Sequence, residues 1–296
     1  MAHPELYLKK NEDKRLRKGH LWVFSNEVDT KRTPLDSFSA GDMVVVKDSS
    51  GKAMGSAYIN PNTLICARII SRKATQKMGG NFFKARISQA LSLRERLFEK
   101  PFYRLIFAES DGLPGLVIDR FGSVLSVQIT TAGIEKQKEI LIAALIELLS
   151  PEAIILKNDN SQRQLENLSQ ETEVIYGKLP ETLIIEENNT LFQLNAVDGQ
   201  KTGWFYDHRN SRAQVAQLAK DQRVLDLFSY SGAWGIPAAM AGASEVTCVD
   251  SSESALAMAK SSAELNHIED KMNFVRSDVF EFLKQARENA ERYDII

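Results

Sequence analysis

The stretch Arg223-Val-Leu-Asp-Leu-Phe-Ser-Tyr-Ser-Gly-Ala-Trp-Gly235, followed after a small-residue segment by Glu245-Val-Thr-Cys-Val-Asp250, decides the fold of this chain. Its first apolar run, 224–228, is typical of a strand that is covered on both faces. The Ser-Tyr-Ser-Gly segment then indicates a turn, and the Ala- and Met-rich segment 234–241 predicts a helix. A second apolar run ends at Asp250. The stretch therefore predicts a strand-turn-helix-strand unit with two parallel strands.

This unit has the features of a ligand-binding turn. Gly232 lets the backbone approach a ligand, and Asp250 is placed to accept hydrogen bonds from ribose hydroxyls. Tyr230 stands where the dinucleotide fingerprint has its first glycine, which disfavours a pyrophosphate on the loop. Asp226, on the first strand, favours a ligand with an ammonium group. Together these residues favour S-adenosylmethionine over NAD as the cofactor; the alternative is an α/β unit that binds nothing.

A third apolar run, 272–275, predicts another parallel strand, and Asp278 follows it. An acid at this position is placed to meet the exocyclic amine of an adenine. It can equally cap the helix that is expected over 280–290, and both roles can hold at once. We therefore expect the carboxylates of Asp226, Asp250 and Asp278 to share one cleft at the tips of three neighbouring strands.

A polar, glycine-rich segment, Gly199-Gln-Lys-Thr-Gly-Trp-Phe-Tyr-Asp-His-Arg209, precedes the helix that leads into this unit. Asp207 and Arg209 could orient a carboxylate or a phosphate, and Phe205 could stack on a planar ring. The alternative is an inter-domain hinge packed by aromatic side chains. We favour cofactor binding for these three residues and RNA contact for Lys201.

Composition and charge exclude several classes of protein. No apolar run in the 296 residues approaches membrane-spanning length, and the N-terminus has no signal-peptide core. The formal net charge of -2 gives no global signal for nucleic acid. Cys66 and Cys248 lie in apolar, strand-like runs and are expected to be reduced core thiols of a cytoplasmic protein. No Cys/His cluster has metal-ligand spacing, so no metal is expected.

A local basic segment near the N-terminus could still bind RNA. Its charged and aromatic residues are Lys14, Arg15, Arg17, Lys18, His20 and Trp22. Basic residues beside exposed aromatics suit phosphate contacts combined with base stacking. The alternative, which we favour for the aromatic residues taken alone, is a solvated charged turn before a core strand, with Trp22 buried.

The remaining patterns divide the chain into three modules. Short strands at close spacing predict a small β-barrel over residues 1–72. An amphipathic helix from Phe82, short strands and a second helix over 134–149 predict a linker helix and a central α+β domain over 73–198. The α/β cofactor-binding domain is expected over 199–296. The predicted fold class is therefore mixed β and α/β.

Several motifs resemble the class I methyltransferases that modify C5 of a cytosine in 23S rRNA. They are Asp226-Leu-Phe-Ser-Tyr-Ser-Gly232, Lys201-Thr-Gly203 with Asp207-x-Arg209, and Glu109-Ser-Asp-Gly-Leu-Pro-Gly115-Leu-x-x-Asp119. The opening Lys18-x-His20-x-Trp22-Val-Phe24-Ser is similar to the start of that family's N-terminal PUA domain, a small β-barrel that binds RNA. The resemblance covers the chain from about residue 5 to its last residue.

The resemblance implies a PUA barrel, a central α+β domain and a Rossmann-like methyltransferase domain that uses S-adenosylmethionine on 23S rRNA. Carried over by residue, the cofactor contacts would be Asp226, Ser229, Gly232, Asp250 and Asp278. Two other functions stay open: an RNA-binding protein without catalysis that keeps a relic cofactor fold, and, less favoured, an NAD-dependent oxidoreductase. No membrane partner is expected, and a homodimer is left open.

One departure from the family concerns catalysis. Family members continue past the strand that begins at Tyr293 into an Asp-Pro-Pro loop and later present a cysteine. Cytosine C5 is a weak nucleophile, so a thiolate must first add to C6 and a base must then remove the C5 proton. Neither Cys66 nor Cys248 fits that place. We therefore expect an N-terminal part of a methyltransferase, without catalytic residues and with a Rossmann-like domain that is incomplete beyond Ile296.

Overall fold

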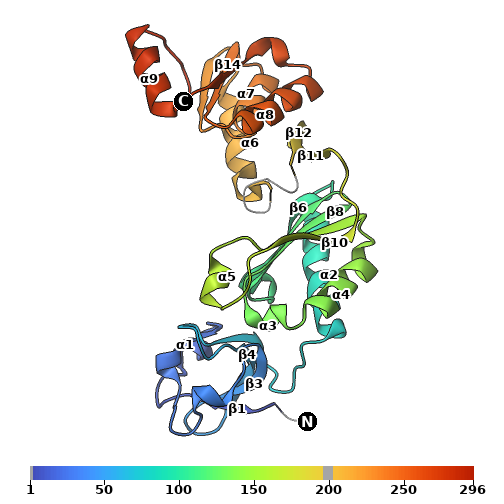
Figure 1. Ribbon diagram of the computed structural model, residues 1–296, viewed down its shortest axis with the longest axis vertical. Helices are drawn as coiled ribbons and strands as arrows, with labels where there is room; N and C mark the ends of the chain where they lie inside the picture. The colour runs from blue at the N-terminus through green and yellow to red at the C-terminus, as the bar shows by residue number, and fades with distance from the viewer. Residues whose placement is uncertain (1–2, 196–202) are drawn as a thin grey trace. The chain divides into compact units, whose positions relative to one another are not determined.

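The computed structural model describes residues 3–195 and 203–296 (Figure 1). The chain divides into two compact units, Met1–Leu179 and Pro180–Ile296. The second unit includes the antiparallel hairpin of β11 (Leu183–Glu187) and β12 (Thr190–Leu194), which the sequence assigns to the central domain. The domain boundaries at 72 and 198 stay predictions.

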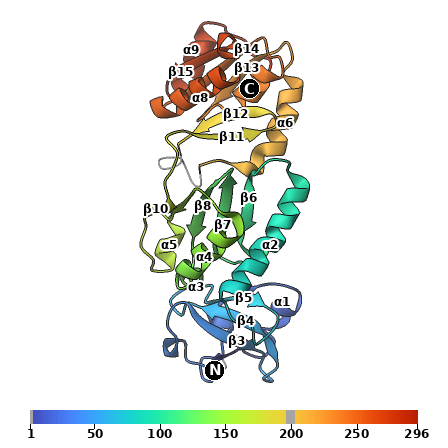
Figure 2. The ribbon, with the colours of Figure 1, turned by 90° about the vertical axis from the view of Figure 1, so that its right-hand side faces the viewer.

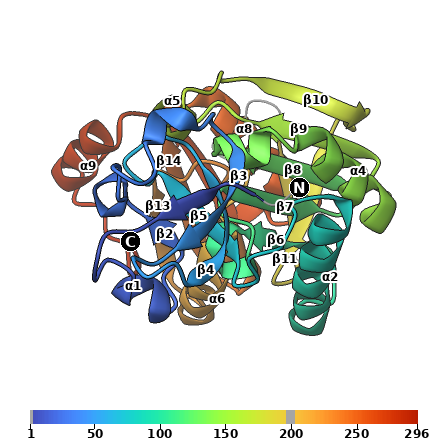
Figure 3. The same ribbon diagram turned by 90° about the horizontal axis from the view of Figure 1, so that it is seen from below.

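The N-terminal part of the first unit is a five-stranded sheet in the order β1-β3-β4-β5-β2. Its strands are drawn in shades of blue in Figure 3. The strands are β1 (Glu5–Tyr7), β2 (Trp22–Val23), β3 (Asp42–Lys47), β4 (Ala53–Ile59) and β5 (Ala67–Ser71). A short helix, α1 (Lys14–Arg17), and two 3-10 turns, η1 (Ser25–Glu27) and η2 (Leu35–Ser37), connect them. Leu6, Val44, Val46 and Ile59 are fully buried in its core. This confirms the predicted β module.

The central part is a second five-stranded sheet in the order β10-β9-β8-β7-β6 (Figure 2). Its strands are β6 (Phe102–Phe107), β7 (Leu116–Phe121), β8 (Val124–Ile129), β9 (Ala153–Lys157) and β10 (Thr172–Gly177). The helical segments are α2 (Gly80–Leu97), η3 (Ala108–Asp111), α3 (Ala132–Glu135), α4 (Lys138–Leu149) and α5 (Gln162–Leu165). Leu116, Ile118, Leu125 and Val127 alternate along β7 and β8 and pack with α2 and α4 in one core.

The helix predicted over 134–149 is two helices, which corrects the sequence prediction. A Cβ on Gly133 would lie 2.2 Å from the Tyr58 ring, so α3 is pressed against β4 of the N-terminal sheet. The buried side chains of α4 belong to the core of the central sheet, which also includes Ile134 of α3 and Tyr58. The chain leaves helical geometry at Gln137, which separates α3 from α4.

Buried polar contacts join the N-terminal sheet to the central sheet within the first unit. The Tyr58 hydroxyl donates to the carbonyl of Pro114 at 2.9 Å and lies 3.1 Å from Oγ1 of Thr131. The buried carboxylate of Glu166 accepts from Asn60 Nδ2 at 2.7 Å and from Arg68 Nη1 at 2.8 Å. Because unpaired buried polar groups are costly, these contacts fix the two sheets to one another.

The second unit contains a parallel three-stranded sheet in the order β13-β14-β15. The strands are β13 (Arg223–Leu227), β14 (Glu245–Asp250) and β15 (Met272–Arg276). The helices are α6 (Arg209–Leu218), α7 (Gly235–Met240), α8 (Glu253–Leu265) and α9 (Val279–Glu288), with 3-10 turns η4 (Tyr206–His208) and η5 (Glu269–Lys271). Ile295 forms a parallel bridge with Val224, so the chain returns beside β13. The α/β prediction is confirmed for this unit.

Candidate functional site

The turn between β13 and α7 is held in an unusual backbone conformation. Phe228 and Tyr230 have φ of 54° and 47°, and Gly232 has φ of 72°. Side-chain-bearing residues adopt such angles at a cost of about 1–3 kcal/mol each, and they persist only where surrounding contacts fix them. Two hydrogen bonds to β14 do so here: Ser229 N–H donates to the Val249 carbonyl, and Tyr230 N–H donates to the Asp250 carboxylate.

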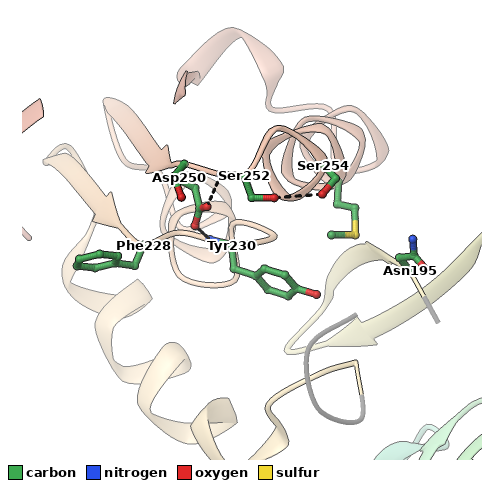
Figure 4. A pocket seen from close by; sticks show the side chains of 8 residues that line it. Asn195, Phe228, Tyr230, Asp250, Ser252 and Ser254 are labelled. Atoms are coloured by element: carbon green, nitrogen blue, oxygen red, sulfur yellow. Dashed lines mark hydrogen bonds between the residues drawn. The ribbon is translucent and has the colours of Figure 1, made fainter. Parts of the chain in front are cut away.

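Asp250 is the central acid of this site. Its Oδ2 accepts the Tyr230 N–H at 2.9 Å, and its Oδ1 accepts the Ser252 N–H at 2.8 Å (Figure 4). A carboxylate oxygen can accept more than one hydrogen bond. Asp250 is half-buried and lines a pocket, so its oxygens are positioned by the backbone and can still accept from ligand hydroxyls.

The pocket has a volume of about 440 Å³, within the range of small-molecule sites. The residues that line it are Asn195, Phe228, Tyr230, Asp250, Ser251, Ser252, Ser254 and Met258. They come from the end of β12, the turn after β13, the tip of β14 and the start of α8 (Figure 4). The pocket therefore lies at the carboxyl ends of parallel strands, where ligands bind in open α/β sheets.

Asp226 lies beneath the turn rather than in the lining of this pocket. Its side chain is 7% exposed, and its Oδ2 accepts the Gly235 N–H at 2.9 Å. Burial, together with the nearby Asp250 charge, raises the pKa of Asp226 to about 6, although the Gly235 and Trp234 N–H groups oppose the shift. Asp226 thus fixes the start of α7 behind the turn.

Asp278 caps α9, the second of its two predicted roles. Its Oδ1 accepts the N–H groups of Phe280 at 2.9 Å and Glu281 at 3.2 Å. Of the three predicted carboxylates, Asp250 is among the residues that line the pocket, whereas Asp226 accepts from the start of α7 and Asp278 caps α9.

Ser229 and Gly232 support the turn. Ser229 is 2% exposed, and the Gly232 N–H donates to the Ser229 carbonyl at 2.8 Å. A Cβ on Gly232 would lie 2.9 Å from Ile236 and 3.1 Å from Ala259, so the left-handed glycine permits close packing of α7 on α8.

Trp204, before α6, and two arginines in the first turn of α6 surround one buried carboxylate. Arg209 and Arg212 both pair with the buried carboxylate of Glu187, and Trp204 Nε1 donates to the same carboxylate at 3.0 Å. The Phe205 carbonyl accepts from Arg212 Nη2, and Asp207 is exposed. These contacts favour the hinge alternative for Arg209, while cofactor roles for Phe205, Asp207 and Arg209 stay predictions. Lys201 lies outside the described residues.

The predicted RNA-binding residues of the N-terminal module differ in their partners. Arg15 pairs with Glu27, and Arg17 pairs with Asp13 and Asp48. The Trp22 indole is half-buried, donates to Glu109 at 2.6 Å and packs edge-on against His20. Lys14 and Lys18 are exposed and form no ion pair within residues 3–195 and 203–296. The two lysines and His20 therefore present the accessible basic surface.

Both cysteines are buried, Cys66 in the N-terminal sheet and Cys248 in β14. Burial raises the pKa of Cys66 to about 12 and that of Cys248 well above its usual value. In the described parts of the chain, no group of three or more His, Cys, Asp and Glu side chains could hold a metal ion. No helix there is long and apolar enough to cross a membrane.

The sequence prediction missed several residues of the pocket. Asn195 and Met258 come from elements that flank the turn only after folding, so no sequence spacing relates them to Asp250. Tyr230 can be identified from the sequence, because a bulky residue replaces a glycine there. It lines the pocket, and its backbone N–H donates to Asp250.

Comparison with known proteins agrees with this architecture. Residues 6–72 match the PUA-like domain, and residues 160–296 match the S-adenosylmethionine-dependent methyltransferase family. Ribosomal RNA large subunit methyltransferase I from Tolumonas auensis is 38% identical over 98% of this chain and 74% of the relative. The same enzyme from Aliivibrio fischeri is 36% identical with the same coverage.

Solved structures share the fold. A SAM-dependent methyltransferase from Streptococcus mutans superposes with a TM-score of 0.82 at 24% identity, over 99% of this chain and 76% of that one. The crystal structure of SMU.776 complexed with SAH gives a TM-score of 0.83 at 23% identity, over 100% and 75% of the two chains.

The fold and the matched domains define an S-adenosylmethionine-dependent methyltransferase with a PUA-like N-terminal domain. Within that class, the chain belongs to the ribosomal RNA large subunit methyltransferase I family, and it spans 74% of the length of the relatives named above. This membership supports the methyltransferase hypothesis over the oxidoreductase and relic-fold alternatives.

Proposed function

We propose that this chain binds S-adenosylmethionine in the pocket around Asp250 and that the methyl acceptor is ribosomal RNA of the large subunit. The observation that carries the cofactor site is the anchoring of both Asp250 oxygens by backbone N–H groups at the mouth of a pocket of about 440 Å³. Such a carboxylate is pre-organised to accept from the two hydroxyls of a ribose.

The other lining residues suit the rest of the cofactor. Phe228 and Met258 supply apolar surface for a purine, and Tyr230 and Asn195 supply polar groups for an amino-acid moiety. Bound S-adenosylmethionine would supply an electrophilic methyl on a sulfonium. Asp250 would hold the ribose, and Asp226 would keep the turn and α7 in position through Gly235.

For the acceptor we propose C5 of a cytosine in 23S rRNA. The names of the relatives support the large-subunit RNA, and the motif resemblance described above supports cytosine C5. This chemistry needs a thiolate that adds to cytosine C6. Cys66 and Cys248 are buried with raised thiol pKa values, so neither is proposed as that nucleophile. The activities proposed for these 296 residues are cofactor binding and RNA binding. The PUA-like module would contribute Lys14, Lys18 and His20 to the RNA contact.

Isothermal titration of the chain with S-adenosylhomocysteine tests the cofactor proposal. We expect one binding site, which NAD does not occupy at the same concentration. Asp250→Ala should abolish or strongly weaken the binding, and filter binding with a 23S rRNA transcript should show an affinity that falls as salt rises. Equal binding of the nucleoside by the wild type and by Asp250→Ala would refute the assignment of the pocket.

A further inference from the structure

The positive charge of this chain is concentrated in one stretch. Residues 49–94 contain no Asp or Glu, although the whole chain has 39 acidic and 37 basic residues. The basic residues of the stretch are Lys52, Arg68, Arg72, Lys73, Lys77, Lys84, Arg86 and Arg94. A stretch that combines eight basic residues with no acid is a local cationic field in an otherwise balanced protein.

Only part of this charge is neutralised by the fold. Arg68 pairs with Glu166, Lys84 with Glu147 and Arg94 with Asp111. The cations without an acidic partner within residues 3–195 and 203–296 are Lys52, Arg72, Lys73, Lys77 and Arg86. Arg72, Lys73 and Lys77 are exposed and follow one another between β5 and α2.

The segment that presents these cations is fixed in place. The Lys73 carbonyl accepts from Ser56 Oγ at 2.8 Å, and the Lys73 N–H donates to Ser71 Oγ at 3.1 Å. Met78 is 6% exposed and belongs to the core beneath α2. The segment is therefore an ordered surface, and the cations lose little additional backbone entropy when they bind a ligand.

A groove of about 250 Å³ lies beside this segment, where α2 begins. It is lined by Gln76, Asn81, Phe82, Ala85, Arg86 and Gln89. Side-chain amides of this kind form paired hydrogen bonds with base edges, and a guanidinium plane can stack on a base. The Arg86 guanidinium also donates to the Ile70 carbonyl at 3.2 Å, which fixes its position at the groove.

The cationic segment continues into the basic surface of the N-terminal module. Arg72 Nη2 donates to the carbonyl of His20 at 3.1 Å. Two acids of the η3 turn are engaged: Asp111 binds Arg94 through two hydrogen bonds of 2.7 Å, and Glu109 binds Trp22. The Arg72 side chain therefore joins the cationic segment to the turn that carries His20.

We propose that the segment 72–77 and the groove beside it form an RNA-binding surface, which holds a single-stranded stretch of RNA. The backbone phosphates would contact Arg72, Lys73 and Lys77, and a splayed base would enter the groove between Asn81, Arg86 and Gln89. Single-stranded RNA fits better than a duplex, because paired bases cannot present their edges to a groove of this size. The inference rests on the proposed RNA-directed function and names a further contact site for it.

Two double variants of the full chain test the surface. Lys73→Glu/Lys77→Glu removes the phosphate contacts, and Asn81→Ala/Gln89→Ala removes the amides of the groove. All four side chains are exposed, so the variants should fold, which thermal unfolding would verify. The matched control is Lys31→Glu/Lys178→Glu, which makes the same charge change at exposed positions of the same unit outside the stretch.

The readout is filter binding of a 23S rRNA transcript and of an unstructured oligonucleotide over a range of salt concentrations. We expect the lysine variant to bind at least about tenfold more weakly than the control, and its slope of log K against log salt to fall by about 1.4, or two phosphate contacts. The amide variant should lose affinity for the oligonucleotide without a change of slope.

Other outcomes separate this inference from the proposed function. If the wild type binds RNA, and the lysine variant and the amide variant both bind RNA as the control does, the proposed surface is refuted while the RNA-directed function stands. If the wild type binds S-adenosylhomocysteine but no RNA, both the surface and the RNA substrate are refuted.

Discussion

The carboxylate of Asp250 accepts the backbone N–H of Tyr230 at 2.9 Å, across 20 residues of sequence. The bond joins the tip of β14 to the turn after β13, and it restrains the Tyr230 backbone at a positive φ. One acid therefore both shapes the turn and lines the pocket. Substitution of this residue should affect ligand binding more than a single lost contact would.

Asp250→Ala is expected to weaken S-adenosylhomocysteine binding by at least about tenfold, because hydrogen bonds to a charged group contribute about 1.5–3 kcal/mol. Titration calorimetry measures the change. Asp270→Ala, which removes an exposed acid in η5, is the matched control and should bind as the wild type does. Equal affinities of the two variants would contradict the assignment of Asp250.

Asp226 should make the stability of the second unit depend on pH. Its pKa is about 6 in the folded chain against 3.8 as the ordinary value, so the folded state holds more protons between about pH 4 and pH 6. The contribution of Asp226 to the free energy of unfolding is fully present below about pH 4 and is lost as the pH rises through 6. The loss is about 3 kcal/mol, from about two pKa units.

Asp226→Asn keeps an acceptor for the Gly235 N–H but cannot ionise. We expect the free energy of unfolding of the variant, relative to the wild type, to increase by about 3 kcal/mol between pH 4 and pH 7. Urea unfolding at a series of pH values measures it. Parallel pH profiles for the two proteins would show that Asp226 does not titrate in this range.

The two thiols should be inert in the folded chain. Since burial raises the pKa of both Cys66 and Cys248, we expect no reaction with a disulfide reagent in native buffer and two equivalents of reaction in urea. RNA that carries 5-fluorocytidine traps the adduct between a thiolate and cytosine C6, because fluorine at C5 replaces the proton that a base must remove to release the enzyme. We expect no such adduct with this chain. An adduct mapped to either cysteine would overturn the argument.

Tyr58→Phe should destabilise the first unit. The Tyr58 hydroxyl is buried and donates to the Pro114 carbonyl, so its removal leaves a buried acceptor without a partner. We expect a loss of about 1–3 kcal/mol in the free energy of unfolding. Tyr176→Phe, at a residue 39% exposed on β10, is the control and should change the stability by less than about 0.5 kcal/mol. The prediction fails if both variants unfold at the same denaturant concentration.

The elements around the Asp250 pocket could be predicted closely from sequence. The apolar runs of β13, β14 and β15 are short, continuous and bounded by turn residues, as strands covered on both faces require. The edge strand β10 was missed because most of its residues are exposed, so it has no alternation of buried and exposed positions. The pairs β1–β3 and β2–β5 are defined by tertiary contact rather than by local pattern.

The residues around the Asp250 pocket were only partly predictable, because local hydrogen bonds in the folded chain decide where each side chain points. Asp250 could be identified because its place at the end of an apolar run fixes where it lies. The direction of a side chain depends on local hydrogen bonds, and these turn Asp226 towards Gly235 and Asp278 towards the start of α9. Glu187 shows the same effect, because its three partners lie 17 to 25 residues away in sequence.

The attachment of the N-terminal sheet through Tyr58 and Glu166 has a consequence for how a long polymer would be handled. Two sheets locked by buried bonds cannot swing apart, so the spacing between Lys18 on one and the α2 groove beside the other is constant. Such a rigid unit would select RNA by its shape. RNA whose bends match that spacing would contact the surface at Lys18 and the α2 groove at the same time, and RNA of another shape would contact only one of the two.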